Sequence, residues 1–585
     1  KDKMTIVAEL EMEVDPRECV DYIRKILPEM ELLACEEITS DEFYKEMVRT
    51  ERNNWTECYI RSMKEDLKLA TEPEHSYYEP VAYQVSERIY TSQDMNRQKQ
   101  SEQMQEIMAS ESFYEEMERI YAPENEKRFV GHPVHYLITA GDKAAADDMI
   151  DILIPYLVKN GYNYLEIMPL NEYPCDESWG YQATGFFSPT SRYGTADQLK
   201  AFVDACHKHG IGVLMDFVPV HFAVDSYGLA NYDGTSLFEY PNSAVGVSEW
   251  GSCNFMHSRG ETRSFLQSCA NYWISEFHMD GIRMDAISRA IYWQGDPARG
   301  VNLNAVEFLQ YMNQSLKGMH PSVILAAEDS TSFPKVTDPV DQGGLGFDYK
   351  WDMGWMNDTL NYFRTAPEYR PENYHKLTFS MMYYYNERFL LEYCHDEVVH
   401  GKATILQKMN GEYEDKFPQA RAMYLYMMAH PGKKLNFMGN EIGQFREWDE
   451  KREQDWMLLD YPAHDAFAHF MKDLNKLYLE HSALWEKDYE ADGFRWIDCH
   501  QEGRCIYVFE RSSKKERILS LFNFSDQEQV YELKLSDAQK LKELLNSNLV
   551  VYGGTQKRKG AVKTIKDGRI LLTLAPYSSV YYLAE

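Results

Sequence analysis

The sequence predicts an α/β protein built on a (β/α)8 TIM barrel, with a C-terminal all-β sandwich and an atypical helical N-terminal segment. Its 585 residues are too many for one hydrophobic core. Short apolar runs alternate with amphipathic helices through residues 131–482, which is typical of a parallel barrel. The last hundred or so residues lose the helices. We therefore predict three parts, at residues 1–130, 131–482 and 483–585.

The first part, residues 1–130, is acidic and helix-like, because helix breakers are sparse and apolar residues recur at three- and four-residue spacing. For the barrel, we predict residues 135–139 as the first strand and residues 144–159 as the helix that follows it. A second interpretation stays open, in which the first 160 or so residues come from another protein by fusion.

The barrel region contains apolar runs that read as buried strands, at residues 213–215, 282–284, 323–327 and 435–438. A helix is predicted over residues 195–209, because Thr195 is a suitable N-cap and Gly210 follows its end. A second helix is predicted over residues 263–277, where the apolar side chains form one stripe.

Three β-like segments close the chain, at residues 504–510, 517–524 and 569–574, and polar turns separate them. They predict the sandwich.

The net charge of −32 argues against nucleic acid or an anionic membrane as a partner, while a neutral polymer stays compatible. The ten cysteines are scattered and none forms a CxxC pair, so we expect reduced thiols rather than disulfides or a zinc site. The sequence contains no run of about 18 apolar residues, the length needed to span a bilayer. We expect a cytoplasmic protein and a monomer or weak oligomer.

Four of the apolar runs lead into polar clusters: Asp216 to His221, Asp280 to Asp285, Glu328 to Ser330, and His395 to Glu397. The carboxyl ends of parallel barrel strands converge on one rim, where active sites lie. The sequence therefore predicts a single site that combines carboxylates and histidines.

Arg283 and Asp285 are two residues apart, so on a strand both point to the same face. The guanidinium would keep Asp285 ionised, as a nucleophile must be, while burial after an apolar run would raise the pKa of Glu328 and keep it protonated as a general acid. Such a pair is the machinery of glycoside cleavage. The alternative for each residue is a helix cap or a structural ion pair.

Competing motifs are weak. His395 and His400 are five residues apart, which on a helix separates them by about 140° and argues against a zinc HExxH site. Gly343-Gly344-Leu-Gly346 lacks the setting of a dinucleotide fingerprint, and no GxxxxGK[ST] occurs.

Longer stretches carry a resemblance. Trp179-Gly-Tyr181-Gln-Ala-Thr-Gly-Phe-Phe-Ser-Pro-Thr-Ser-Arg-Tyr-Gly194 and His395-Asp-Glu-Val-Val-His-Gly-Lys402 are similar to signature segments of the bacterial glycogen branching enzymes, within the α-amylase superfamily. The resemblance runs from about Tyr164 to the C-terminus. Members of that family normally carry a β-sandwich module before the barrel, and residues 1–130 do not match it.

The resemblance implies roles for matching residues. Asp285 would be the nucleophile, Glu328 the general acid and base, and Asp396 a stabiliser of the transition state. His221 and His395 would hydrogen-bond the sugar, Arg283 would orient Asp285, and Tyr181 would stack on the sugar ring. Asp216 would support the hydrogen-bond network and Trp179 would contribute to substrate binding. The resemblance implies no metal and no organic cofactor.

The implied activity is transfer of an α-1,4-glucan chain to a glucose 6-hydroxyl. Two alternatives remain open: another α-amylase-type hydrolase or 4-α-glucanotransferase, and a non-catalytic glucan-binding or fusion protein. The expected partner is an α-1,4-glucan such as amylose or glycogen.

Overall fold

The computed structural model describes residues 149–557, 560 and 562–585. Among these residues the main sheet has seven parallel strands, which confirms the predicted barrel class. The predicted first strand, residues 135–139, and the whole of segment 1–130 lie outside the described residues. In spatial order the strands are β1 (Tyr164–Ile167), β4 (Gly212–Phe217), β7 (Gly281–Met284), β8 (Ile324–Ala327), β9 (Tyr349–Trp351), β10 (Phe389–Tyr393) and β11 (Lys433–Asn436).

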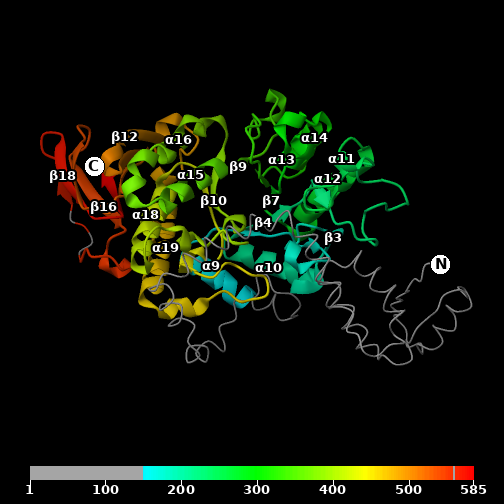
Figure 1. Ribbon diagram of the computed structural model, residues 1–585, viewed down its shortest axis with the longest axis horizontal. Coiled ribbons are helices and arrows are strands. Elements are labelled where there is room, and N and C mark those ends of the chain that lie inside the picture. The colour runs from blue at the N-terminus through cyan, green and yellow to red at the C-terminus, as the bar shows by residue number, and fades with distance from the viewer. Residues whose placement is uncertain (1–148, 558–559, 561) are drawn as a thin grey trace, which may run out of the picture. The chain divides into compact units, whose positions relative to one another are not determined.

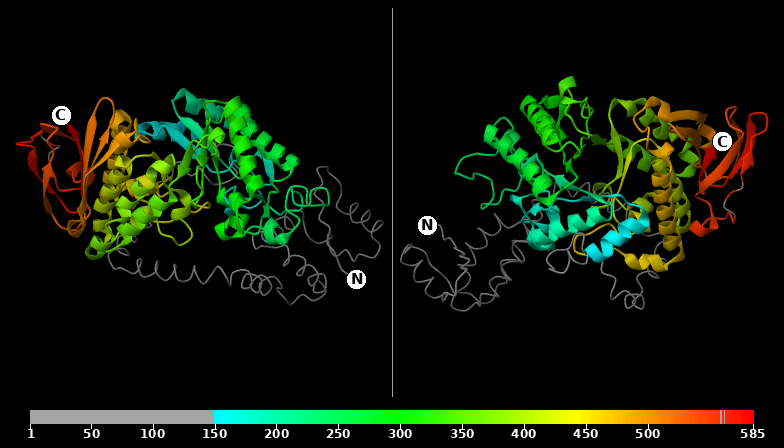
Figure 2. Two further views of the ribbon diagram at one scale, coloured as in Figure 1. Left: turned by 90° about the horizontal axis from the view of Figure 1, so that it is seen from above. Right: turned by 180° about the vertical axis from the view of Figure 1, so that it is seen from behind.

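Helices surround this sheet on its outer side (Figures 1 and 2). The larger ones are α9 (Ile154–Asn160), α10 (Ala196–Lys208), α12 (Gly260–Phe277), α14 (Leu303–Met319), α15 (Met353–Arg364), α18 (Tyr413–Ala429) and α19 (Pro462–Glu480). Short elements lie in the connections: α11 (Ser243–Gly246), α13 (Ser288–Ile291), α16 (Lys376–Phe379), α17 (Ile405–Lys408), β2 (Asn171–Glu172), β3 (Gly185–Pro189), β5 (His221–Phe222) and β6 (Cys253–Asn254).

The predicted caps of α10 are confirmed. The Thr195 side chain accepts a hydrogen bond from the Gln198 amide, and the Gln198 side chain accepts one from the Thr195 amide in return. Gly210 follows the helix with a φ of 73°, a left-handed conformation that favours glycine. Helix α12 begins at Gly260, a few residues before the predicted start. Of the helix predicted at 144–159, the described part is a π-turn (Met149–Leu153) followed by α9.

Strand β11 begins at Lys433, two residues before the predicted start. Lysines are poor strand formers, which is why the sequence pattern excludes them. In the structure the Lys434 ammonium donates to the carbonyl oxygens of His430 and Gly432, so its charge is solvated by backbone dipoles.

The C-terminal part consists of a six-stranded antiparallel sheet and a two-stranded one, which together form the predicted sandwich. Its inner core comes from alternate residues such as Val508, Leu521 and Leu572. The larger sheet contains β12 (Phe494–Gln501), β13 (Ile506–Ser512), β14 (Arg517–Asn523), β19 (Ser578–Ala584), β16 (Lys540–Asn546) and β17 (Lys563–Thr564), and the smaller one contains β15 (Gln529–Lys534) and β18 (Arg569–Leu574).

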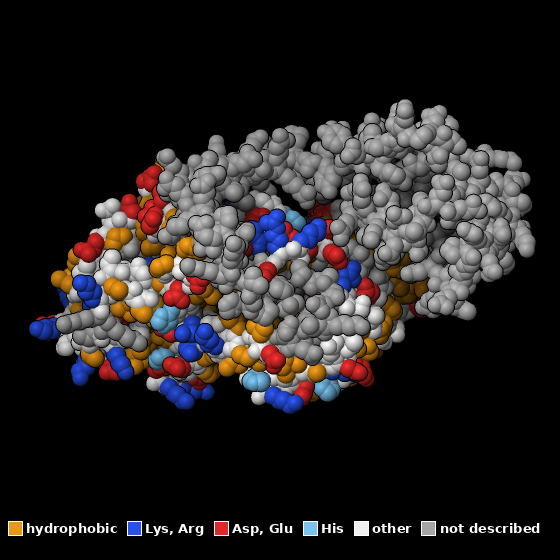
Figure 3. All heavy atoms as spheres, turned by 90° about the horizontal axis from the view of Figure 1, so that it is seen from below, with side chains coloured by type: hydrophobic (Ala, Val, Ile, Leu, Met, Phe, Trp, Pro, Cys, Tyr) orange, Lys and Arg blue, Asp and Glu red, His pale blue; other side chains and the backbone are white. Residues whose placement is uncertain are grey.

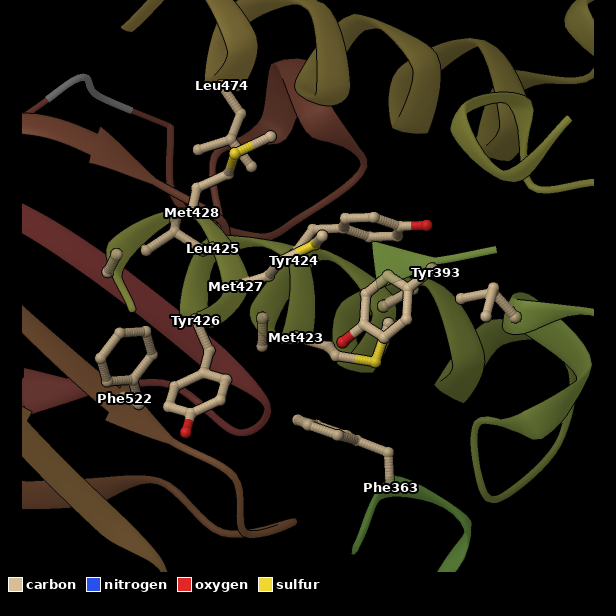
Figure 4. Close-up of a cluster of buried hydrophobic side chains, with 14 of the residues drawn as sticks. Phe363, Tyr393, Met423, Tyr424, Leu425, Tyr426, Met427, Met428, Leu474 and Phe522 are labelled. Carbon is tan, nitrogen blue, oxygen red and sulfur yellow. The ribbon is translucent and has the colours of Figure 1, made fainter. Parts of the chain in front are cut away.

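The other face of the larger sheet packs on the barrel through α18 (Figure 4). Tyr426 of α18 lies against Phe522 of β14, with ring centroids 5.6 Å apart. Tyr507 of β13 stacks on Tyr374 at 4.1 Å, and each hydroxyl donates to a backbone carbonyl across the junction. One hydrophobic core therefore joins the barrel to the sheet.

On the face drawn in Figure 3, acidic and basic side chains of the described residues are interspersed. No helix within the described ranges is long and apolar enough to cross a membrane.

Candidate active site

The predicted site residues gather at the carboxyl ends of the parallel strands. Asp216 lies on β4, Asp285 directly follows β7, Glu328 directly follows β8, and His395 comes shortly after β10. The register of β4 and β7 sets Asp216 beside Arg283. Parallel pairing thus brings together residues that are far apart in sequence.

Arg283 is the centre of the cluster, and its side chain is fully buried. Its Nη1 donates to Asp216 and to Asp285, each at 2.9 Å, and its Nη2 donates to Glu328 at 2.6 Å. The guanidinium also lies 4.1 Å from the centre of the Trp351 ring. One planar, permanently charged group therefore fixes three carboxylates.

The charges in this cluster do not balance, since three carboxylates face one guanidinium. Burial raises the pKa of Asp285 well above its usual range, the negative charge of Glu328 adds to this, and Arg283 opposes it. Arg283 thus favours the ionised form of Asp285, as expected from the sequence, but burial and the charge of Glu328 outweigh its effect on the pKa. The physical reason is that one positive charge is divided among three buried acids.

A strained backbone turn supports Asp285 and Glu328. Ala286 has a φ of 46°, in the left-handed region that side chains other than glycine rarely adopt. In this conformation the Ala286 amide donates to Glu328 Oε2 at 3.1 Å, and the Ile287 amide donates to the Glu328 carbonyl at 3.0 Å. The turn thus joins the two strand ends that carry the carboxylates.

Tyr181 closes one side of the cluster. Its hydroxyl donates to Asp216, and its ring stacks on His395 with centroids 5.4 Å apart and an interplanar angle of 13°. The structure therefore brings Tyr181, Asp216 and His395 into one network with Arg283.

Asp396 is the most open of the acids, with 45% of its side chain exposed, against 14% for Asp285 and 13% for Glu328. Burial acts to raise the pKa of Asp396, but the charges of His395 and Arg283 outweigh it, and the pKa is lowered. His395 Nε2 lies 3.5 Å from Asp396 Oδ1. This carboxylate is thus ionised at neutral pH and accessible.

The two remaining predicted residues make different contacts. His221 Nδ1 lies 2.9 Å from the Ser252 hydroxyl, and burial lowers its pKa to about 4, so the ring is neutral. Trp179 stacks on His400, with ring centroids 4.9 Å apart, and its indole nitrogen donates to Glu450 at 3.1 Å. Trp179 therefore braces the segment that carries His395 and Asp396.

Sequence reasoning missed Glu166. It lies on β1, and burial, together with the negative charges of Asp216 and Glu328, raises its pKa to about 8. A carboxylate in the middle of the apolar run Tyr164-Leu-Glu-Ile-Met was the available signal. Among the described residues, no group of three or more His, Cys, Asp or Glu side chains is placed to hold a metal ion.

Two family models match the chain. One described as the catalytic domain of alpha amylase matches residues 141–232, and one described as the C-terminal all-beta domain of alpha amylase matches residues 496–585.

Among similar proteins, the 1,4-alpha-glucan branching enzyme of Fusobacterium nucleatum is 47% identical over 427 residues, which cover 72% of this chain and 69% of the relative. The chain belongs to the 1,4-alpha-glucan branching enzyme family. Family members from Geobacillus stearothermophilus and Bacillus cereus are 45% and 43% identical, over 70% and 74% of this chain. The matches span 64% of the Geobacillus relative and 68% of the Bacillus relative.

Solved structures agree on the fold of this branching-enzyme family member. An Anoxybacillus alpha-amylase matches with a TM-score of 0.56 at 18% identity, over 79% of this chain and 94% of its own. A Geobacillus thermoleovorans alpha-amylase, solved in complex with acarbose, matches with a TM-score of 0.57 at 19% identity, over 76% of this chain and 93% of its own.

Proposed function

We propose that the chain is a 1,4-α-glucan branching enzyme, a retaining transglycosylase that cleaves an α-1,4 bond and transfers the glucan to a glucose 6-hydroxyl. The observation that carries the proposal is the Arg283 guanidinium, which holds Asp285 and Glu328 on its two terminal nitrogens. Two carboxyl groups so close together suit a covalent glycosyl-enzyme mechanism, in which no water needs to fit between them and the sugar.

Hydrogen bonding assigns the roles within the pair. Both described hydrogen bonds to the Glu328 carboxylate reach Oε2, which leaves Oε1 to carry the proton of a general acid. The described bond to Asp285 reaches Oδ1, which leaves Oδ2 to attack the anomeric carbon. In the glucan complex Glu328 would carry the proton and Asp285 would be ionised, as the roles of general acid and nucleophile require.

The reaction then has two displacements. Asp285 Oδ2 bonds to the anomeric carbon as the glycosidic bond breaks, and Glu328 gives its proton to the departing 4-oxygen. Glu328, now ionised, takes the proton of the incoming 6-hydroxyl as that oxygen displaces Asp285.

Asp396 and His395, at the exposed side of the cluster, would bind sugar hydroxyls and favour the positively charged transition state, and neutral His221 would add a hydrogen bond. Tyr181 would contact the sugar ring, and Asp216 would hold Tyr181 and Arg283 in place. Trp179 would act by positioning His395. The proposed partner is an α-1,4-glucan, bound by a monomer or weak oligomer.

The choice of a 6-hydroxyl over water as acceptor rests on the family relatives, because the carboxylates do not distinguish the two. The test is incubation of the purified chain with amylose, followed by proton NMR and a reducing-end assay. New α-1,6 anomeric signals with few new reducing ends are expected. Reducing ends without α-1,6 signals would instead identify a hydrolase, and no change in either would contradict both activities.

A further inference from the structure

The backbone of Glu328 is fixed from the side of β7. Its amide donates to the carbonyl of Met284 at 3.0 Å, and its own carbonyl accepts a hydrogen bond from the Ile287 amide at 3.0 Å. The other neighbour of β8 is β9, and the described pairing with that strand ends one residue before Glu328, at Ala327 and Lys350. Past this point the chain is tied to β9 by side chains.

The side chains that make this connection form a buried ion pair. Lys350 Nζ donates to Asp329 Oδ2 at 2.8 Å and to the Thr331 carbonyl at 2.9 Å. The other carboxylate oxygen of Asp329 accepts hydrogen bonds from the Thr331 amide at 2.9 Å and from the Thr331 hydroxyl at 2.7 Å. The Asp329 side chain is fully buried, and that of Lys350 is 7% exposed. The pair thus ties the segment that follows Glu328 directly to β9.

Stability alone is a weak explanation for a buried ion pair. The cost of taking two charges out of water offsets much of their attraction, and apolar side chains of similar volume often stabilise a fold as well or better. What the Lys350–Asp329 pair supplies is a defined geometry, because the ammonium and the carboxylate are each anchored by a further hydrogen bond to Thr331. The geometry so defined is that of the residue next to the general acid.

We propose that Lys350 and Asp329 are positioning residues for Glu328, an inference that rests on the proposed transglycosylase function. The Cα atoms of Glu328 and Asp329 lie about 3.8 Å apart across one rigid peptide unit, so a shift of the Asp329 backbone moves Glu328 with it. The bonds to β7 fix Glu328 on one side, and the ion pair fixes it on the other. Glu328 Oε1, which carries the proton in the proposed mechanism, is thereby held in place for transfer to the glycosidic oxygen.

The pair acts on Glu328 and not on the nucleophile. Among the described residues, neither Lys350 nor Asp329 forms a hydrogen bond or an ion pair with Asp285, which is held instead by Arg283. Loss of the pair should therefore weaken the two steps in which Glu328 gives or takes a proton. It should spare the attack of Asp285 on the anomeric carbon.

The test compares two glycosyl donors in the full-chain variants Asp329→Asn and Lys350→Met. With amylose, the departing 4-oxygen needs the proton of Glu328, so kcat should fall about 10- to 100-fold while KM changes less than about threefold. With an α-maltooligosyl fluoride, the departing fluoride needs no proton, so the first burst of fluoride release should stay within about threefold of the parent. Sodium azide, an acceptor without a proton to remove, should then restore steady turnover of the fluoride and yield a maltooligosyl azide.

The matched control is Asp488→Asn, which removes one charge from another buried ion pair, with Arg511. It should change the rates with the two donors by the same factor. Lys350→Arg keeps the charge and should retain more of kcat than Lys350→Met. Asp329→Asn keeps an oxygen that can accept from Thr331, so it gives the answer even if Lys350→Met does not fold.

The two ways in which the test can fail are distinct. An unchanged kcat in Asp329→Asn, or equal losses with amylose and with the fluoride, would overturn the positioning role of the pair. A parent chain that converts neither donor would overturn the proposed transglycosylase function, and the inference with it.

Discussion

The single guanidinium of Arg283 forms ion pairs with three carboxylates, and only an arginine side chain can make all three contacts. A lysine ammonium is a compact charge that lacks the planar fork, so it could not reach Asp216, Asp285 and Glu328 together in the same geometry. The buried acids would then lose their common partner, and burial would raise the pKa of Asp216 and of Asp285 further.

At the same scale, Asp285→Asn should lower glucan transfer by roughly 10³-fold or more, because the amide oxygen cannot form the covalent intermediate. Binding of maltooligosaccharide, measured by calorimetry, should stay within about threefold of the parent. The control is Asp567→Asn, an exposed residue of the C-terminal part. Residual activity within tenfold of the parent would remove Asp285 as the nucleophile.

The element that carries Asp396 is a tightly held turn, residues 395–403. His400, Gly401 and Ala403 all have positive φ. This conformation is unfavourable for His400 and Ala403, so contacts with the surrounding structure must hold the turn in it. The Glu447 carboxylate supplies that constraint, because it accepts hydrogen bonds from the amides of Gly401 and Ala403 at 2.8 and 2.6 Å.

Glu447 is therefore a positioning residue for Asp396. Glu447→Ala should lower kcat about 10- to 100-fold with a smaller change in KM, since the loosened turn misplaces Asp396. Glu447→Gln keeps one acceptor and should restore part of kcat. Exposed Glu372→Ala is the control. The assignment fails if Glu447→Ala matches the control in both kinetic constants.

Elements whose pattern is local were predictable from sequence. The N-cap at Thr195 and strand β18 lie where the sequence places them. Strand β11 begins earlier than predicted, because the pattern of apolar residues does not reveal that the nearby carbonyls of His430 and Gly432 accept hydrogen bonds from Lys434. The pairing of Trp179 with His400 was not predictable, because the residues are far apart in sequence and nothing in their two segments shows that the rings meet. The carboxylates of Asp216, Asp285 and Glu328 could be predicted as site residues because they lie at strand ends. The excess of negative charge around Arg283 could be recognised only from the structure.

On the scale of the whole molecule, the barrel and the C-terminal sheet share their core, so they should unfold together. Tyr507→Ala removes a fully buried ring from the junction and should lower the free energy of unfolding by about 3–5 kcal/mol. Urea unfolding, followed by circular dichroism and by hydrogen exchange in each part, should give one shared transition. Tyr311→Ala, at a ring 63% exposed, is the control. Loss of the sheet alone, with the barrel intact, would contradict a shared core.

The pH dependence of stability offers a second test at this scale. The pKa of Glu166 is about 8 in the folded chain against an ordinary value of 4.5, so the folded state binds more protons between these values. The free energy of unfolding should therefore fall as pH rises from about 4.5 to about 8. Glu166→Gln should flatten that slope, while Glu372→Gln should leave it unchanged. Equal slopes in the parent and in Glu166→Gln would show that Glu166 is not held protonated.

Helix α18 has consequences for how this protein can be recombined. Nearly every side chain along it is buried, between the barrel strands on one side and the C-terminal sheet on the other. A chimera that carried the C-terminal sheet of a distant relative would need side chains on that sheet that fit Tyr426 and its neighbours on α18. A chimera with its crossover near residue 483 should therefore be recovered from a recombination library less often than one with its crossover before α18, because only the latter takes the helix and the sheet from one parent.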